Sequence, residues 1–165
     1  NVTDLDVIPD DGMGPYLVIK VNGVRIFCRG GNWGMDDMMK NISREHLDEI
    51  IDLALISGLD GVIATNTTNS REGLKASDEK IQSIGNGGLS GAPLFERSLE
   101  TVKYIHKKTN GILPIIAVGG IMTPEQAVQM LQAGASLIQI YSGFIYNGPG
   151  FVKKILKQVK ATYKK

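Results

Sequence analysis

The sequence predicts an α/β fold in which short buried strands alternate with amphipathic helices. From Leu47 onward, short apolar runs alternate with stretches that repeat apolar residues every three or four positions, a pattern typical of βα units around a parallel sheet. Hydrophobic residues make up 42% of the 165 residues and charged residues 21%, a composition that can bury one ordinary core. We therefore expect a parallel sheet in residues 47–165 and a different arrangement in residues 1–46.

The N-terminal segment predicts a β-hairpin. Residues 16–27 form two apolar runs around Asn22-Gly23, a dipeptide that favours tight hairpin turns. Residues 4–14 show little periodicity, and we expect them to be disordered.

The first predicted helix begins after Ser43 and ends before Gly58. Serine often caps the start of a helix, and glycine often follows its end. The apolar residues of this predicted helix recur at the spacing of one helix face: Leu47, Ile50, Ile51, Ala54 and Leu55. The apolar run at residues 61–64 predicts a buried strand, and the polar run at residues 65–70 follows it.

A long loop is predicted over residues 71–93. It contains four glycines that leave the backbone accessible: Gly85, Gly87, Gly88 and Gly91. A loop of this length in a compact domain indicates a functional segment.

Two further βα units follow the loop. The first has a helix over residues 96–108, with Leu99, Val102 and Ile105 on one face, and ends in a strand over residues 114–118. The next helix has a strong start signal in Thr123 as N-cap, Pro124 at the first helical position and Gln126 three residues after the cap. A strand over residues 136–140 completes the second unit.

A last helix is predicted near the C-terminus. Its buried side is expected to carry Val152, Ile155, Leu156 and Val159. Lysines occupy the other side, and we expect a solvated outer face there in preference to a lipid-binding one.

Composition excludes several function classes. The formal net charge is +1, and the basic residues do not interleave with aromatics, so nucleic-acid binding is not expected. Cys28 is the only cysteine, which excludes an internal disulfide and a cysteine-cluster metal site. No stretch reaches the roughly 18 apolar residues that span a bilayer. A cytoplasmic location is therefore expected.

Residues directly after each strand are the candidate site, because ligands in parallel α/β folds bind beyond the carboxyl ends of strands. Gly119-Gly120 and Ser142-Gly143 each precede a helix, which suits phosphate binding. The alternative is that these glycines only permit tight turns. The hydroxyls and amide of residues 65–68 suit a flat ligand with alternating carbonyl and N–H groups, and the alternative there is a polar turn.

Four ordered motifs resemble a known family. They are residues 60–68 (DGVIATNTT), 87–94 (GGLSGAPL), 117–121 (AVGGI) and 133–143 (AGASLIQIYSG). Their order and spacing resemble the C-terminal half of class 2, quinone-dependent dihydroorotate dehydrogenases, from about residue 47 to residue 165. That family is a TIM barrel carrying FMN, which oxidises dihydroorotate to orotate in pyrimidine biosynthesis and passes electrons to a membrane quinone. The resemblance implies a partial TIM barrel of about three to four C-terminal βα units.

The resemblance also implies site residues and partners. Cofactor contacts fall on Thr65, Gly91, Gly120, Tyr141 and Ser142. Contacts to the orotate ring fall on Asn66 and Thr67. No catalytic residue and no metal ligand is carried over. Dihydroorotate or orotate and a quinone are the implied partners, with a peripheral position at the inner face of the membrane.

A complete barrel needs roughly 250 residues, and the family's catalytic serine base lies in the half that this sequence does not match. The resemblance therefore leaves open whether the chain catalyses the reaction alone. The alternative is a noncatalytic half-barrel that binds flavin or phosphate and associates with a second copy through its open edges.

Residues 18–46 resemble a different family. The segment 21–40 (VNGVRIFCRGGNWGMDDMMK) is similar to the barrel entry of glycoside hydrolase family 2 enzymes of the mannosidase and glucosaminidase type. The chain thus resembles a fusion of two barrel fragments that meet between about residues 41 and 47. A third alternative follows, in which the chain is a sugar-binding fragment whose Trp33 stacks on a sugar.

Overall fold

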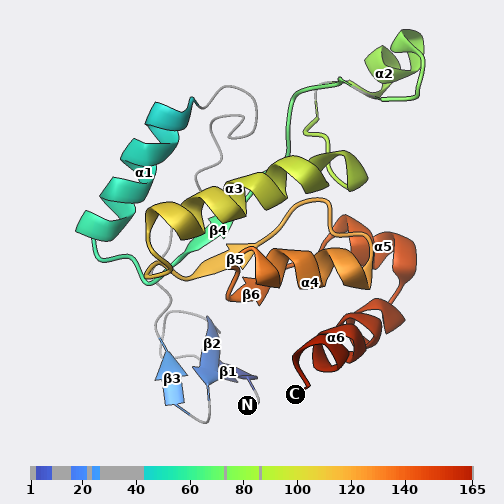
Figure 1. The fold of residues 1–165 in the computed structure, drawn as a ribbon. Coiled ribbons are helices and arrows are strands. Elements are labelled where there is room, and N and C mark those ends of the chain that lie inside the picture. The colour runs from blue at the N-terminus through green and yellow to red at the C-terminus, as the bar shows by residue number, and fades with distance from the viewer. Residues whose placement is uncertain are drawn as a thin grey trace. The chain divides into compact units, whose positions relative to one another are not determined.

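The computed structural model describes residues 3–8, 16–21, 24–26, 43–72, 74–85 and 87–164. The chain divides into two compact units, residues 1–34 and residues 35–165, and Figure 1 shows the elements of each. We refer to them as the N-terminal unit and the C-terminal unit. The segment 27–42, which contains Trp33, lies outside the described residues.

The N-terminal unit contains one antiparallel sheet in the order β1-β2-β3. Its strands are β1 (Thr3–Ile8), β2 (Tyr16–Val21) and β3 (Val24–Ile26). Strands β2 and β3 pair from Val21↔Val24 outward, which confirms the predicted hairpin.

Strand β1 corrects the prediction of disorder at residues 4–8, and residues 9–14 of that prediction lie outside the described residues. Thr3 to Ile8 pairs along the whole length of β2, from Thr3↔Val21 to Ile8↔Tyr16. Asp4, Leu5, Asp6 and Val7 alternate polar and apolar side chains, which is the period of a strand. The alternation covers only four residues, so it does not predict a strand by itself. A strand forms here because β2 provides the neighbouring backbone with which β1 can pair.

The C-terminal unit alternates helices with a parallel sheet in the order β4-β5-β6 (Figure 1). In chain order its elements are α1 (Arg44–Ile56), β4 (Val62–Ala64), α2 (Asp78–Ile84), the 3₁₀ turn η1 (Ala92–Leu94), α3 (Phe95–Lys108), β5 (Ile115–Ala117), α4 (Pro124–Gln132), β6 (Leu137–Ile138), α5 (Ser142–Asn147) and α6 (Gly150–Tyr163). Val62 pairs with Ile115, and Ala117 pairs with Ile138. The predicted α/β class with a parallel sheet is confirmed. None of the described helices is long and apolar enough to cross a membrane.

One face of the parallel sheet packs against helices. Ile115 and Ala117 of β5 are fully buried together with Val102 of α3 and Met130 of α4, and Figure 1 shows α3 and α4 on the same side of the strands. This cluster is the core of the C-terminal unit. The predicted inner face of α3 is confirmed, because Leu99, Val102 and Ile105 are all buried.

The opposite face of the sheet is apolar and open. Ile63 pairs with Ile116, which pairs in turn with Leu137, so these three side chains form one row across the sheet. Ile63 and Leu137 are each 60% exposed. Within the described residues, β4 and β6 are the outer strands of this sheet.

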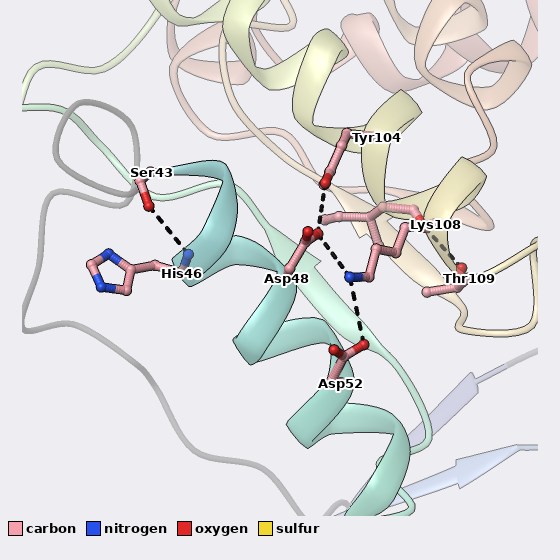
Figure 2. A network of polar contacts seen from close by, with 8 residues as sticks. Ser43, His46, Asp48, Asp52, Tyr104, Lys108 and Thr109 are labelled. Atoms are coloured by element: carbon pink, nitrogen blue, oxygen red, sulfur yellow. Dashed lines mark hydrogen bonds and ion pairs between the residues drawn. The ribbon is translucent and has the colours of Figure 1, made fainter.

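The helix caps follow the sequence. The Thr123 hydroxyl accepts from the Gln126 backbone N–H, and the Gln126 side chain accepts from the Thr123 N–H. This is the predicted capping box of α4. The Ser43 hydroxyl accepts from the His46 N–H at the start of α1, as Figure 2 shows.

Helix α2 corrects the prediction of a continuous loop over residues 71–93. Its N-cap is Ser77, whose hydroxyl accepts from the Lys80 N–H, and Asp78 and Glu79 lie in its first turn. Acidic residues near a helix N-terminus interact favourably with the helix dipole. The apolar residues of α2 are Ile81 and Ile84, and one such pair in seven residues gives too little periodicity to predict a helix.

The last helix also differs from its prediction. Ile155 is buried as expected and Val159 packs against the core, but Val152 and Leu156 are exposed. Phe151 is buried in their place. Residues 151, 155 and 159 recur every four positions, so they form the stripe that faces the core.

A polar network joins α1 to α3 (Figure 2). The Tyr104 hydroxyl donates to Asp48 Oδ1 over 2.6 Å, and Lys108 Nζ lies 3.0 Å from the same carboxylate. Lys108 also lies 3.7 Å from Asp52, and the Arg44 guanidinium lies over the Tyr104 ring. The hydrogen bonds from Tyr104 and then Lys108 lower the pKa of Asp48, and the bond to Asp48 raises the pKa of both Tyr104 and Lys108.

Replacing Tyr104 by phenylalanine is expected to raise the pKa of the Asp48 carboxyl toward its ordinary value of 3.8, because the strongest hydrogen bond to the carboxylate is lost. A folded-state pKa below 3.8 means that Asp48 stabilises the fold above pH 3.8, and this contribution is lost as the pH falls through the folded-state pKa. An NMR titration of the Asp48 side-chain carbon measures the change. Tyr163→Phe on α6 is the control, and an unchanged Asp48 pKa in Tyr104→Phe would contradict the network.

Candidate functional site

The carboxyl ends of the three parallel strands meet at one edge of the sheet. The Thr65 N–H donates to the Val118 carbonyl and the Val118 N–H to the Ala64 carbonyl, each over 2.6 Å. The Gln139 N–H donates to the Ala117 carbonyl over 2.9 Å. These bonds continue the ladder past the strands, so the chain leaves the sheet at the same edge toward the predicted sites at residues 65–68, Gly119-Gly120 and Ser142-Gly143.

Residues 65–67 divide into one buried and two exposed positions. Thr65 is buried, and its Oγ1 lies 2.8 Å from the Ser98 hydroxyl and 3.4 Å from the Val118 carbonyl oxygen. Asn66 and Thr67 are exposed, and the Asn66 side-chain oxygen accepts from the Thr67 N–H over 2.8 Å. The Asn66 amide and the Thr67 hydroxyl are therefore exposed, directly after the buried Thr65.

The glycine-rich loop lies against this polar run. Thr68 and Leu89 exchange backbone hydrogen bonds of 3.1 and 2.7 Å, which form an antiparallel bridge. Arg71 donates to the carbonyl oxygens of Thr68 and Gly87. The loop is thus held at the carboxyl edge of the sheet by backbone pairing and by one guanidinium.

The same loop reaches the start of α5. The Ser90 and Ser142 hydroxyl oxygens lie 3.0 Å apart. Gly91 is buried, and a Cβ built on it would lie 3.7 Å from the Ser142 Cβ. Gly91 therefore brings a bare backbone next to the Ser142 side chain, and two predicted cofactor residues lie together.

Close packing explains two further glycines. A Cβ on Gly120 would lie 2.3 Å from the Phe95 nitrogen, and a Cβ on Gly143 would lie 2.1 Å from the Ile121 carbonyl oxygen. Such contacts do not occur in real structures, so the backbone itself requires glycine at both positions. This packing supports the tight-turn interpretation for both glycines.

The structure brings most of the predicted site residues to one edge. Thr65 lies beside Gly119, Gly91 lies beside Ser142, and Gly120 lies against the first residue of α3. Tyr141 is 73% exposed and precedes α5.

A hollow of about 460 Å³ adjoins α2, lined by Asn69, Arg71, Ile81, Gln82 and Gly85. Among the described residues there is no group of three or more His, Cys, Asp and Glu side chains suited to a metal ion.

Two serines of this edge were not predicted from the sequence. Ser90 lies within a matched motif but received no role, although its hydroxyl contacts Ser142. Ser98 is fully buried and contacts Thr65. A signal for Ser98 exists in the sequence, because it shares the apolar face of α3 with Val102 and Ile105 at the i, i+4, i+7 spacing.

Comparisons with known proteins identify relatives of the C-terminal unit. A family described as "Dihydroorotate dehydrogenase" matches residues 38–163. The dihydroorotate dehydrogenase (quinone) of Kineococcus radiotolerans is 47% identical over 122 residues, which cover 74% of this chain and 33% of that protein. The corresponding protein of Nocardia farcinica is 50% identical over 115 residues, which cover 70% of this chain and 31% of that protein.

Solved structures show the same relationship. A crystal structure of ligand-free DHODH from Eimeria tenella superposes with a TM-score of 0.67 at 38% sequence identity. The aligned part covers 74% of this chain and 33% of that chain. The C-terminal unit is therefore part of an α/β barrel, as predicted, and the chain spans about a third of the length of these relatives.

Proposed function

The chain belongs to the dihydroorotate dehydrogenase family, and on that premise we propose that it forms the C-terminal part of an FMN site at which dihydroorotate is oxidised to orotate. One observation carries the proposal. Thr65, Gly91, Gly120 and Ser142, which are far apart in the sequence, lie at the carboxyl edge of one parallel sheet, where such folds bind ligands.

The residues of this edge fit the chemistry of a flavin mononucleotide. Ser90 and Ser142 offer paired hydroxyls that can donate to phosphate oxygens. Gly91 has no side chain of its own beside Ser142, which allows a close approach of a ligand to its backbone, whereas Gly120 permits the tight turn that packs against Phe95. When bound, FMN would accept a hydride equivalent from the substrate. The part of this chain is to bind and orient the cofactor through Thr65, Gly91, Gly120, Tyr141 and Ser142.

Substrate contact is assigned to Asn66 and Thr67. Both side chains are exposed directly after the buried Thr65, and an amide with a hydroxyl can match a ring that alternates carbonyl and N–H groups. A quinone as electron acceptor, a cytoplasmic location and a peripheral position at the inner face of the membrane belong to the same proposal. The quinone is supported by the relatives from Kineococcus radiotolerans and Nocardia farcinica, which are named dihydroorotate dehydrogenase (quinone).

We also propose that residues 1–34 are not part of the barrel. The strands described there, β1, β2 and β3, form an antiparallel sheet of their own, and the family match begins only at residue 38. This supports a fusion whose N-terminal part has another origin, such as the glycoside-hydrolase-like segment.

A second candidate function is a noncatalytic flavin- or phosphate-binding unit that a second copy completes. Ile63, Ile116 and Leu137 form an apolar row across the sheet, and the row ends on the two outer strands β4 and β6. This arrangement favours the second function, because exposed strand edges and apolar faces promote association. Dihydroorotate oxidation by the chain would favour the first function. FMN binding without oxidation, in a dimer, would favour the second.

Titration of the full chain with FMN is expected to show saturable binding that Ser142→Ala weakens by roughly ten- to a hundredfold, since a hydrogen bond to a charged group contributes roughly 1.5–3 kcal/mol. Flavin fluorescence measures the affinity, and light scattering measures the molar mass in the same samples. Ser136→Ala is the matched control, because Ser136 precedes β6 at the other end of the strand. No saturable binding, or equal affinities of the two variants, would refute the proposed site.

A further inference from the structure

Ser98 is a polar residue in a place where stability alone favours an apolar one. It lies on the core-facing side of α3 and is fully buried. Serine has a lower helix propensity than alanine, and a buried hydroxyl costs free energy unless it is hydrogen-bonded. The Ser98 hydroxyl therefore depends on its partner, and that partner is Thr65 Oγ1 at 2.8 Å.

The pair of hydroxyls lies where three elements meet. Thr65 directly follows β4, Gly119 lies two residues after β5, and Ser98 belongs to α3. A Cβ on Gly119 would lie 2.3 Å from the Ser98 Oγ and 3.1 Å from the Thr65 Oγ1. The glycine thus leaves the space that the hydroxyl pair occupies.

The contacts of Thr65 hold its side chain in one orientation. When Ser98 donates to Thr65 Oγ1, the Thr65 hydroxyl hydrogen is available to the Val118 carbonyl oxygen at 3.4 Å. The Thr65 N–H already donates to the same carbonyl oxygen. Removal of the Ser98 hydroxyl would leave Thr65 without the shorter of its two hydroxyl contacts, at the position that precedes the exposed Asn66 and Thr67.

We propose that Ser98 is a positioning residue of the flavin site. It acts through Thr65 by holding the Thr65 hydroxyl, and with it the start of the polar run at residues 65–67, in one orientation. The inference rests on the proposed FMN function. It assigns to α3 a polar contribution to the site beyond packing. Ser98 itself touches no ligand in this scheme.

A double-mutant cycle on the full chain tests the inference. Ser98→Ala is expected to weaken FMN binding about fivefold, the loss of one ordinary hydrogen bond. In a Thr65→Val background, where the hydroxyl partner is already absent, Ser98→Ala is expected to change the affinity little. Thr101→Ala is the matched control, because its hydroxyl lies on the same helix and bonds only to the Arg97 carbonyl in the contacts observed. Equal weakening in both backgrounds would overturn the positioning role.

A measurement without ligand separates this inference from the function on which it rests. NMR couplings of the Thr65 side chain are expected to report one χ1 rotamer in the parent chain and rotamer averaging in Ser98→Ala. A Thr65 rotamer that stays fixed in Ser98→Ala would overturn the inference. Averaging in a chain that binds no FMN would retain the positioning role and refute the flavin function.

Discussion

Replacing Gly120 by alanine is expected to lower the free energy of unfolding by about 3 kcal/mol, the sum of backbone strain and a steric collision. Gly120 has a φ of 73°, a left-handed conformation that costs other residues roughly 1–2 kcal/mol. A Cβ would also lie 2.3 Å from the Phe95 nitrogen and 2.6 Å from its Cα. Both are backbone atoms at the start of α3, so no side-chain rotation relieves the contact. Urea unfolding followed by circular dichroism measures the loss.

Gly148→Ala separates the two causes. Gly148 has a φ of 72°, but nothing lies within 4 Å of the position of its Cβ. It is therefore expected to show only the strain of roughly 1–2 kcal/mol. If both variants lost the same free energy, the close approach of Gly120 to Phe95 would be refuted. Because of this collision, a substitution of Gly120 tests folding, and Ser142→Ala is the appropriate test of binding.

Replacing Phe151 by alanine is expected to lower the free energy of unfolding by about 3–5 kcal/mol. Phe151 is only 1% exposed and belongs to the core cluster. Its removal loses the burial of an aromatic ring. It also leaves a cavity beside Gly143, because the ring packs closely against that glycine. Typical stabilities are about 5–15 kcal/mol, so this single change could remove most of the stability of the unit.

Phe144→Ala is the matched control for Phe151. Phe144 belongs to the neighbouring α5 and is 43% exposed, so its removal loses less apolar burial and opens no closed cavity. We expect a loss of about 1 kcal/mol, in keeping with the ordinary effect of a partly exposed substitution. Equal losses for the two phenylalanines in thermal or urea unfolding would show that α6 does not dock on the core as described.

Much of the C-terminal unit could be predicted from the sequence because its elements have strong local signals. The helix predicted over residues 96–108 is α3, and the strand predicted over residues 114–118 contains β5. The capping box of α4 is a reciprocal contact between residues three apart, so it needs no knowledge of distant partners.

Where such signals are weak or ambiguous, an element was missed or its buried face was wrongly predicted. Helix α6 carries two apolar rows, with Phe151 and Ile155 on one and Val152 and Leu156 on the other. Periodicity describes both rows equally well, and only the packing against α4 decides between them. Helix α2 buries no residue, and strand β1 needs its neighbour β2 to form a ladder.

The candidate site could be located from the sequence but not assembled. The ends of strands are visible in the sequence as polar or glycine-rich residues after apolar runs. This pattern predicts ligand contacts at Thr65, Gly120 and Ser142. The contact between Ser98 and Thr65 joins residues 33 positions apart, and no local pattern connects them. Long-range hydroxyl pairs of this kind become visible only when the helix is placed against the sheet.

The packing of the glycines has a consequence for how such a sequence can drift during evolution. Gly120 and Gly143 are fixed by backbone contacts to Phe95 and Ile121, so a descendant in which this edge bound no ligand would still have to retain them in order to fold. The exposed Asn66 is under no comparable constraint from glycine packing, whereas Thr67 packs closely against Gly88. Glycines of this edge therefore record the ancestry of the barrel, and the exposed Asn66 is the residue whose retention records selection for a ligand.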